Sequence, residues 1–164
     1  MDKNMTKIKD LLQFLNGVAP YALQESYDNS GLITGSPDLE IKAVLVSLDC
    51  TEAIVEEAIE LGCNVIVSHH PIVFKGLKSL TGKNYVERTV IKAIQNNISI
   101  VSCHTNLDNI INGVNGKIAQ KIGLKNLKIL SPKEQTLKKL SFYVPESHLE
   151  TVSKAIHEAG AGQI

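Results

Sequence analysis

The sequence of 164 residues lacks long hydrophobic runs, tryptophan, and an excess of charge of either sign. No apolar run approaches the roughly 20 residues that a membrane-spanning helix needs, so we expect no membrane association. The first residues, MDKNMTKIKD, are not followed by an apolar segment, so we expect no secretory signal and a cytoplasmic protein. Seventeen basic residues balance seventeen acidic ones, so charge gives no reason to expect nucleic acid as a partner.

Cysteine is also scarce. The three cysteines, Cys50, Cys63 and Cys103, are widely spaced and form no Cys-x-x-Cys pair. This spacing argues against a disulfide framework or a zinc ribbon, and it favours reduced thiols that act as small buried hydrophobic side chains. Cys103 could instead be a nucleophile beside His104, although its place at the end of an apolar run favours a core thiol.

What is present is an ordinary globular composition, with 43% hydrophobic and 21% charged residues. Strand-like and helix-like segments alternate along the chain. We expect strands at 32–34, 41–48, 64–68 and 98–103. We expect a first helix from residue 8 that ends near residues 17–20, and further helices at 51–61, 84–96 and 110–122. This alternation predicts an α/β fold with a mostly parallel sheet flanked by helices on both faces. Residues 41–48 are nearly all apolar, which is typical of a strand covered on both faces.

The pattern changes after residue 130. We expect a first α/β domain at residues 1–130, a linker at 131–136, and a separate segment at 137–164. That segment contains a predicted strand at 140–144 and a predicted helix at 149–159. One strand and one helix cannot bury their own apolar faces. The segment is therefore either an appendage on the first domain or the first strand and helix of a second small α/β domain, which is truncated here.

Polar side chains follow three of the predicted strands at their carboxyl ends. Asp49 follows the strand at 41–48, and His69-His70-Pro71 follows the strand at 64–68. The segment HTNLD at residues 104–108 follows the strand at 98–103. In open α/β sheets, ligands bind in the crevice outside these strand ends. This shared edge is therefore the predicted position of a functional site.

The histidines admit more than one interpretation. Adjacent residues of a regular strand point to opposite faces, but Pro71 breaks the strand, so His69 and His70 could both serve one site. Imidazole suits zinc, iron, nickel or copper, and a carboxylate extends the choice to manganese or magnesium. A histidine pair in a loop could equally be exposed without function. His104 and Asp108 at the neighbouring strand end favour a metal site.

The neighbouring residues have structural alternatives as well. Asp108 could cap a helix that begins near Ile110. Thr51 could cap the helix that runs to Leu61, and Asp49 could cap the same helix. His104 could be a partly buried histidine bonded to backbone, a ligand, an acid–base group, or a group that orients a ligand.

Four segments resemble, in order, the motifs of a known family. They are YDNSGL at 27–32, SLDCT at 47–51, SHHP at 68–71 and SCHTNLD at 102–108. They resemble the GTP cyclohydrolase 1 type 2 family, also called the Nif-three-like dinuclear-metal proteins. The match runs from the first helix to about residue 130. Residues 137–162 resemble the start of the domain that is inserted between the two family halves in many bacterial members.

The resemblance implies two divalent metal ions per site in the full-length protein, with zinc, iron or manganese as candidates. It implies that His69, His70 and Asp108 are metal ligands. It matches His104 to a pocket residue that is not usually counted as a ligand, and we take His104 as the candidate catalytic residue. It also implies assembly into toroidal homohexamers.

The family's remaining ligands are a histidine and a glutamate four residues later, in a C-terminal half that this sequence lacks. The chain therefore resembles the first half of a longer protein, and we expect these 164 residues alone to be a poor catalyst.

The first functional hypothesis is a metal-dependent hydrolase acting on GTP or a related small molecule. The alternative is a non-enzymatic metal-binding scaffold or regulator that acts through protein partners. A third hypothesis is a flavodoxin-like binding domain whose histidines are incidental. Bound metal in the purified full-length protein would separate the first two hypotheses from the third.

Overall fold

The computed structural model describes residues 5–131 and 139–162, and the chain divides into two compact units, Met1–Ser131 and Pro132–Ile164. We describe each unit by itself. The helices of the first unit are α1 (Ile8–Val18), η1 (Tyr21–Leu23), α2 (Glu52–Glu60), α3 (Tyr85–Gln95), α4 (Thr105–Asp108) and α5 (Val114–Lys121). Its strands are β1 (Gly31–Thr34), β2 (Val44–Ser47), β3 (Val65–Ser68) and β4 (Ser99–Ser102).

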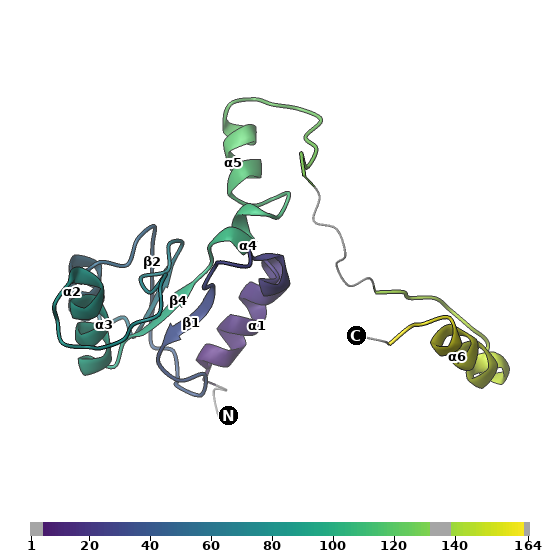
Figure 1. Ribbon diagram of the computed structural model, residues 1–164, viewed down its shortest axis with the longest axis horizontal. Helices are drawn as coiled ribbons and strands as arrows, with labels where there is room; N and C mark the ends of the chain where they lie inside the picture. The colour runs from purple at the N-terminus through teal and green to yellow at the C-terminus, as the bar shows by residue number, and fades with distance from the viewer. Residues whose placement is uncertain (1–4, 132–138, 163–164) are drawn as a thin grey trace. The chain divides into compact units, whose positions relative to one another are not determined.

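The strands form one four-stranded sheet in the order β1-β4-β3-β2 (Figure 1). Strands β2, β3 and β4 are parallel, and β1 runs antiparallel to β4. The predicted α/β fold with a mostly parallel sheet is therefore confirmed. Because β1 is antiparallel, its first residue, Gly31, pairs with Ser102 at the carboxyl end of β4. The loop before β1 consequently reaches the edge of the sheet where the parallel strands end.

Helices cover both faces of the sheet, as the sequence predicts (Figure 1). On one face, α2 and α3 pack against alternate strand residues that include Ile66 and Ile100. On the other face, Ile8 of α1 packs against Val65 and Val101. The inner strands β3 and β4 therefore form the core of this unit and place their carboxyl ends rigidly beside each other.

The prediction of a doubly covered strand at residues 41–48 is wrong. The strand is shorter, Val44–Ser47, and it lies at the edge of the sheet with β3 as its neighbour. The side chain of Val46 is 76% exposed. The apolar run of the sequence indicated burial, but α1 packs over the inner strands and leaves part of the edge strand open.

The predicted helix at 110–122 begins later than expected. The chain forms the short helix α4, then a turn, and then α5, whose N-cap position is Gly113. A Cβ atom at Gly113 would lie 1.8 Å from the backbone oxygen of Leu107. The turn is thus so tight that it needs glycine there, and this close approach separates α4 from α5.

The second unit contains η2 (Glu146–His148) and α6 (Leu149–Glu158), which confirms the predicted helix at 149–159 in all but its last residue. The predicted strand at 140–144 is wrong, because these residues form no strand in the structure. A strand needs a neighbour for its backbone groups, and residues 139–162 provide no second strand. Most of the predicted linker, residues 132–136, lies outside the described residues. Within residues 5–131 and 139–162, every helix is too short or too polar to cross a bilayer.

Candidate metal centre

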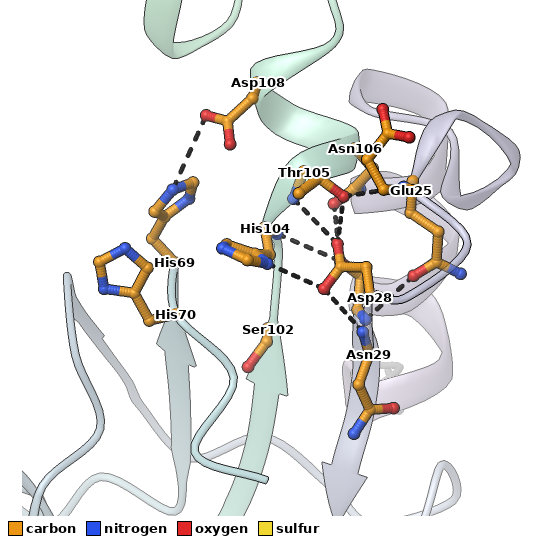
Figure 2. Close-up of polar contacts among 12 residues, drawn as sticks. Glu25, Asp28, Asn29, His69, His70, Ser102, His104, Thr105, Asn106 and Asp108 are labelled. Carbon is orange, nitrogen blue, oxygen red and sulfur yellow. Dashed lines mark hydrogen bonds and ion pairs between the residues drawn. The ribbon is translucent and has the colours of Figure 1, made fainter. Parts of the chain in front are cut away.

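The candidate site lies where β3 and β4 end. Ser68 and Ser102 are the last residues of these neighbouring strands and pair in register, and their Oγ atoms lie 3.1 Å apart. His69 directly follows β3, and His104 follows β4 by two residues. Figure 2 shows the three histidine rings above these strand ends, with Asp108 facing His69. The shared edge predicted from the sequence therefore does bring the polar clusters together.

The imidazole rings of His69, His70 and His104 form a compact cluster. One ring nitrogen from each lies within 4.8 Å of the other two. The adjacent residues His69 and His70 both take part because the chain has left the strand, and their ring centroids are 4.9 Å apart. Asp108 lies at the end of α4, and its Oδ1 is 3.7 Å from Nε2 of His69. The structure thus places three imidazoles and one carboxylate around a common space.

Each of the three rings holds its Nδ1 against an oxygen acceptor. Nδ1 of His69 lies 2.8 Å from the backbone oxygen of Cys103. Nδ1 of His70 lies 2.7 Å from Oδ1 of Asp49, and Nδ1 of His104 lies 2.8 Å from Oδ1 of Asp28. Carbonyl and carboxylate oxygens accept hydrogen bonds, so each Nδ1 is the donor, and a ring that is neutral then has its lone pair on Nε2. Histidines that bind metals are held in the same way.

The site is open on one side. The side chains of His69 and His104 are 17% and 18% exposed, whereas that of His70 is 48% exposed. Asp108 is 31% exposed. An ion or small molecule could therefore reach the cluster past His70, while His69 and His104 are held in the protein.

Asp28 is the most enclosed charged group at the site, with a side chain that is 0% exposed. Its Oδ2 accepts hydrogen bonds from the backbone N–H of Thr105, at 3.0 Å, and from the Thr105 hydroxyl. Its Oδ1 accepts from the backbone N–H of Asn29 and from His104 (Figure 2). Burial acts to raise the pKa of this carboxyl, but the hydrogen bonds from Thr105, His104 and Asn29 outweigh burial and lower the pKa to about 2.

The same loop is tied to α4 by further side chains. The Ser30 hydroxyl lies 3.0 Å from Oδ1 of Asn106, whose Nδ2 donates to the backbone oxygen of Ala19 at 2.7 Å. Ser30 Oγ also accepts from the backbone N–H of His104 at 3.2 Å. Sequence reasoning assigned no role to Asp28, Ser30 or Asn106. The available signal was their place in two of the motifs that carry the family resemblance, at 27–32 and 102–108, but the contacts between these motifs depend on the antiparallel pairing of β1 with β4.

The structure decides several alternatives about structural roles. Asp108 does not cap a helix at Ile110, because α5 begins at Val114 with Gly113 at its N-cap. Thr51 does cap α2, since its side chain accepts from the backbone N–H of Ile54, while Asp49 contacts His70. Nδ1 of His104 is hydrogen-bonded to the carboxylate of Asp28 and not to a backbone oxygen.

The surroundings of Cys103 disfavour a role as a nucleophile. Its residue is 5% exposed, and burial raises the pKa of the thiol, which disfavours the reactive thiolate. It contributes to the site through its backbone oxygen, which holds His69.

The donor atoms fit a divalent metal. Imidazole nitrogens with free lone pairs and a nearby carboxylate suit zinc, iron or manganese. The predicted ligands His69, His70 and Asp108 are brought together, and His104 joins the same cluster. Their roles as ligands or as acid–base groups stay predictions.

The chain is similar to several known proteins. Staphylococcus aureus and Staphylococcus epidermidis proteins named GTP cyclohydrolase 1 type 2 homolog are 40% and 38% identical over 157 and 154 residues, respectively. These matches cover 96% and 94% of this chain but only 43% and 42% of the relatives. This chain therefore spans less than half the length of the curated relatives it matches.

The chain is also similar to solved structures, and it again covers only part of each. The crystal structure of a Bacillus cereus protein related to NIF3 matches with a TM-score of 0.76 at 34% identity, covering 98% of this chain and 45% of that chain. Reduced HcgD from Methanocaldococcus jannaschii matches with a TM-score of 0.71 at 31% identity, covering 77% and 50%. A family model described as Duf34/NIF3 (NGG1p interacting factor 3) matches residues 6–163. The resemblance found in the motifs is thus confirmed, and the chain belongs to the Duf34/NIF3 family.

Proposed function

We propose that residues 1–130 form a metal-binding domain that supplies part of a dinuclear metal centre, and that the longer protein is a metal-dependent hydrolase. The observation that supports this most directly is the convergence of three imidazole rings beside Asp108. The names of the Staphylococcus relatives suggest GTP or a related small molecule as the substrate. By resemblance, we propose that the longer protein forms a toroidal homohexamer, and we propose a cytoplasmic location on the grounds of the sequence expectations above.

The chain's own side chains have distinct parts in this proposal. His69 and His70 bind metal through Nε2, and Asp108 adds a negative oxygen ligand. His104 lies in the same cluster, and its Nε2 can accept a proton as a catalytic base. Two divalent ions, when bound, supply Lewis acidity, which polarises the bond to be hydrolysed. His70 is on the exposed side, so the substrate approaches there.

Metal titration tests the ligand assignment. We expect the chain to bind Zn²⁺ or Mn²⁺ in isothermal titration calorimetry, and we expect His70→Ala and Asp108→Ala to weaken that binding. His157→Ala is the matched control, because His157 lies on α6 in the second unit and bonds to the backbone oxygen of Ser153. Equal binding by all four proteins would contradict the proposed centre.

The hydrolase assignment needs the full-length protein. We expect metal-loaded full-length protein to release product from GTP, and we expect His104→Gln to reduce kcat more than it reduces metal content. Loss of metal together with activity would make His104 a ligand instead. A full-length protein that holds metal but leaves GTP and other small phosphoesters intact would contradict the hydrolase proposal.

The second candidate is a scaffold that acts through protein partners. It is favoured by exposed apolar side chains on and after α5, because such a surface is typical of an interaction site. Ile118 is 53% exposed, Ile122 is 67% exposed, and Leu130 is fully exposed. If cellular function survives His70→Ala in the full-length protein but is lost on Ile122→Glu, the scaffold is the correct assignment.

A further inference from the structure

Two carboxylates contact histidines of the cluster, and they differ in how completely they are enclosed. Asp28 has a side chain with no exposed surface, whereas the side chain of Asp49 is 59% exposed. Asp28 lies 76 residues before His104 in the sequence, in the loop before β1. No motif spacing connects these two residues, so their contact depends on the pairing of β1 with β4.

Asp28 is faced by two backbone N–H groups, two hydroxyls and one imidazole nitrogen. Oδ2 meets the backbone N–H and the hydroxyl of Thr105, and the Ser30 hydroxyl lies 3.1 Å away. Oδ1 meets the backbone N–H of Asn29 at 2.6 Å and Nδ1 of His104 at 2.8 Å. The backbone N–H groups of Thr105 and Asn29 can only donate, and together with the other hydrogen bonds they keep Asp28 ionised, with a pKa lowered to about 2. A carboxylate only accepts, so Nδ1 of His104 carries the shared hydrogen.

We propose that Asp28 is a positioning residue that fixes the ring of His104 by accepting a hydrogen bond from Nδ1–H, so that the lone pair of the neutral ring lies on Nε2. The inference rests on the proposed function for its significance, because an unprotonated Nε2 is what a metal ligand or a catalytic base requires. The tautomer itself does not depend on any bound metal. Asp49 holds His70 by the same kind of contact, but its exposed carboxylate can be replaced by water.

The substitution Asp28→Asn separates these effects. The amide has one oxygen and one NH₂ group in place of two acceptors. Each side of the pocket presents one backbone N–H, from Thr105 at Oδ2 and from Asn29 at Oδ1. The imidazole of His104 can change from donor to acceptor, so we expect the amide oxygen to face Thr105. The NH₂ group then faces His104 and donates a hydrogen bond. Nδ1 of His104 can accept that hydrogen bond only when Nδ1 carries no proton. The proton moves from Nδ1 to Nε2, which removes the lone pair from the cluster.

Long-range ¹H–¹⁵N correlation spectra of the metal-free, ¹⁵N-labelled 164-residue chain report this tautomer directly. We expect the wild type to show His104 protonated at Nδ1 and the Asp28→Asn variant to show it protonated at Nε2. Asp49→Asn is the matched control, and we expect it to leave the His104 tautomer unchanged. Zn²⁺ affinity measured by calorimetry should fall about 10–100-fold in Asp28→Asn.

Thr105→Val tests whether a structural effect alone could explain the result. This variant removes a hydrogen bond from Asp28 and lowers stability, but it leaves the carboxylate opposite His104, so we expect the Nδ1–H tautomer to persist. A wild-type spectrum with the proton on Nε2 would overturn the proposal, and it needs no variant to fold. An unchanged tautomer in a folded Asp28→Asn variant would also overturn it. A tautomer change without any Zn²⁺ binding in the wild type would support the positioning role and contradict the metal centre.

Discussion

The two sides of the candidate metal centre use the same contact in opposite surroundings. On the inner side, Asp28 and His104 are joined at 2.8 Å with exposed fractions of 0% and 18%. On the outer side, Asp49 and His70 are joined at 2.7 Å with exposed fractions of 59% and 48%. The two distances are nearly equal, so distance alone does not indicate how strongly a carboxylate fixes a histidine.

The difference follows from where each carboxylate lies in the fold. Asp28 is in the loop before β1, which pairs with the inner strand β4, and α4 and η1 are close to the same loop. Asp49 follows β2 at the edge of the sheet. The inner pair is therefore enclosed by backbone donors, and the outer pair remains in contact with water. We expect rigid positioning on the inner side and adaptable binding on the outer side.

Removal of each carboxylate gives the largest expected contrast. We expect Asp28→Ala to lower the free energy of unfolding by about 3–5 kcal/mol, because several buried donors lose their acceptor at once. We expect Asp49→Ala to lower it by less than about 1 kcal/mol, since water replaces an exposed carboxylate. Urea denaturation monitored by circular dichroism measures both. Equal losses in the two variants would contradict the claim that the enclosed carboxylate stabilises the fold more than the exposed one.

A pH titration isolates the buried carboxylate. Its pKa is about 2 in the folded protein and near 3.8 in the unfolded chain, so its stabilising contribution is present above about pH 4. That contribution is lost as the pH falls from about 4 to 2. We expect the difference in unfolding free energy between the wild type and Asp28→Asn to shrink as the pH falls below about 4. If this difference in unfolding free energy stays constant down to pH 2, the hydrogen bonds to Asp28 do not lower its pKa in the folded protein.

The sequence could predict the outer side of the site better than the inner side. His69 and His70 follow a buried strand, and the edge where parallel strands end is a general property of α/β sheets. The contact of Asp28 with His104 needed the position of β1, whose antiparallel pairing no local pattern reveals. The prediction that residues 41–48 are covered on both faces failed for a related reason. Strand order decides which apolar strand lies at the edge of the sheet, and it leaves Val46 exposed.

The fold was predictable where local patterns agree with long-range packing. The three parallel strands and the helices between them were found in the sequence, and Thr51 was recognised as the cap of α2. The strand predicted at 140–144 failed because a β-rich segment needs a neighbouring strand that residues 139–162 lack. The break between α4 and α5 was missed because the close approach of Gly113 to Leu107 involves no side-chain pattern.

Glycine substitutions test whether the inner side is rigid beyond Asp28. A methyl group at Gly113 would lie 1.8 Å from the backbone oxygen of Leu107, next to Asp108. We expect Gly113→Ala to lower the free energy of unfolding by about 1–3 kcal/mol and to weaken Zn²⁺ binding by displacing Asp108. Gly17→Ala is the matched control in α1, because no atom lies within 4 Å of its added methyl group. That control should raise stability by about 0.5–1 kcal/mol. If Gly113→Ala is as stable as the wild type, the turn between α4 and α5 can shift to accommodate a methyl group at little cost in free energy.

The smallest expected effect is the coupling between Asp49 and His70 on the outer side. A double-mutant cycle with Asp49→Ala, His70→Ala and both together isolates the energy of their contact from the other effects of each substitution. We expect a coupling below about 1 kcal/mol, because both side chains are about half exposed and water competes for the same hydrogen bond. The coupling should fall further in about 1 M NaCl, where screening extends only about 3 Å. The same cycle on Asp28 and His104 should give a larger value that changes little with salt, since the carboxylate is enclosed. If the outer coupling equalled the inner one and resisted salt, the 2.7 Å contact would be protected from water in solution, and Asp49 would position His70 as firmly as Asp28 positions His104.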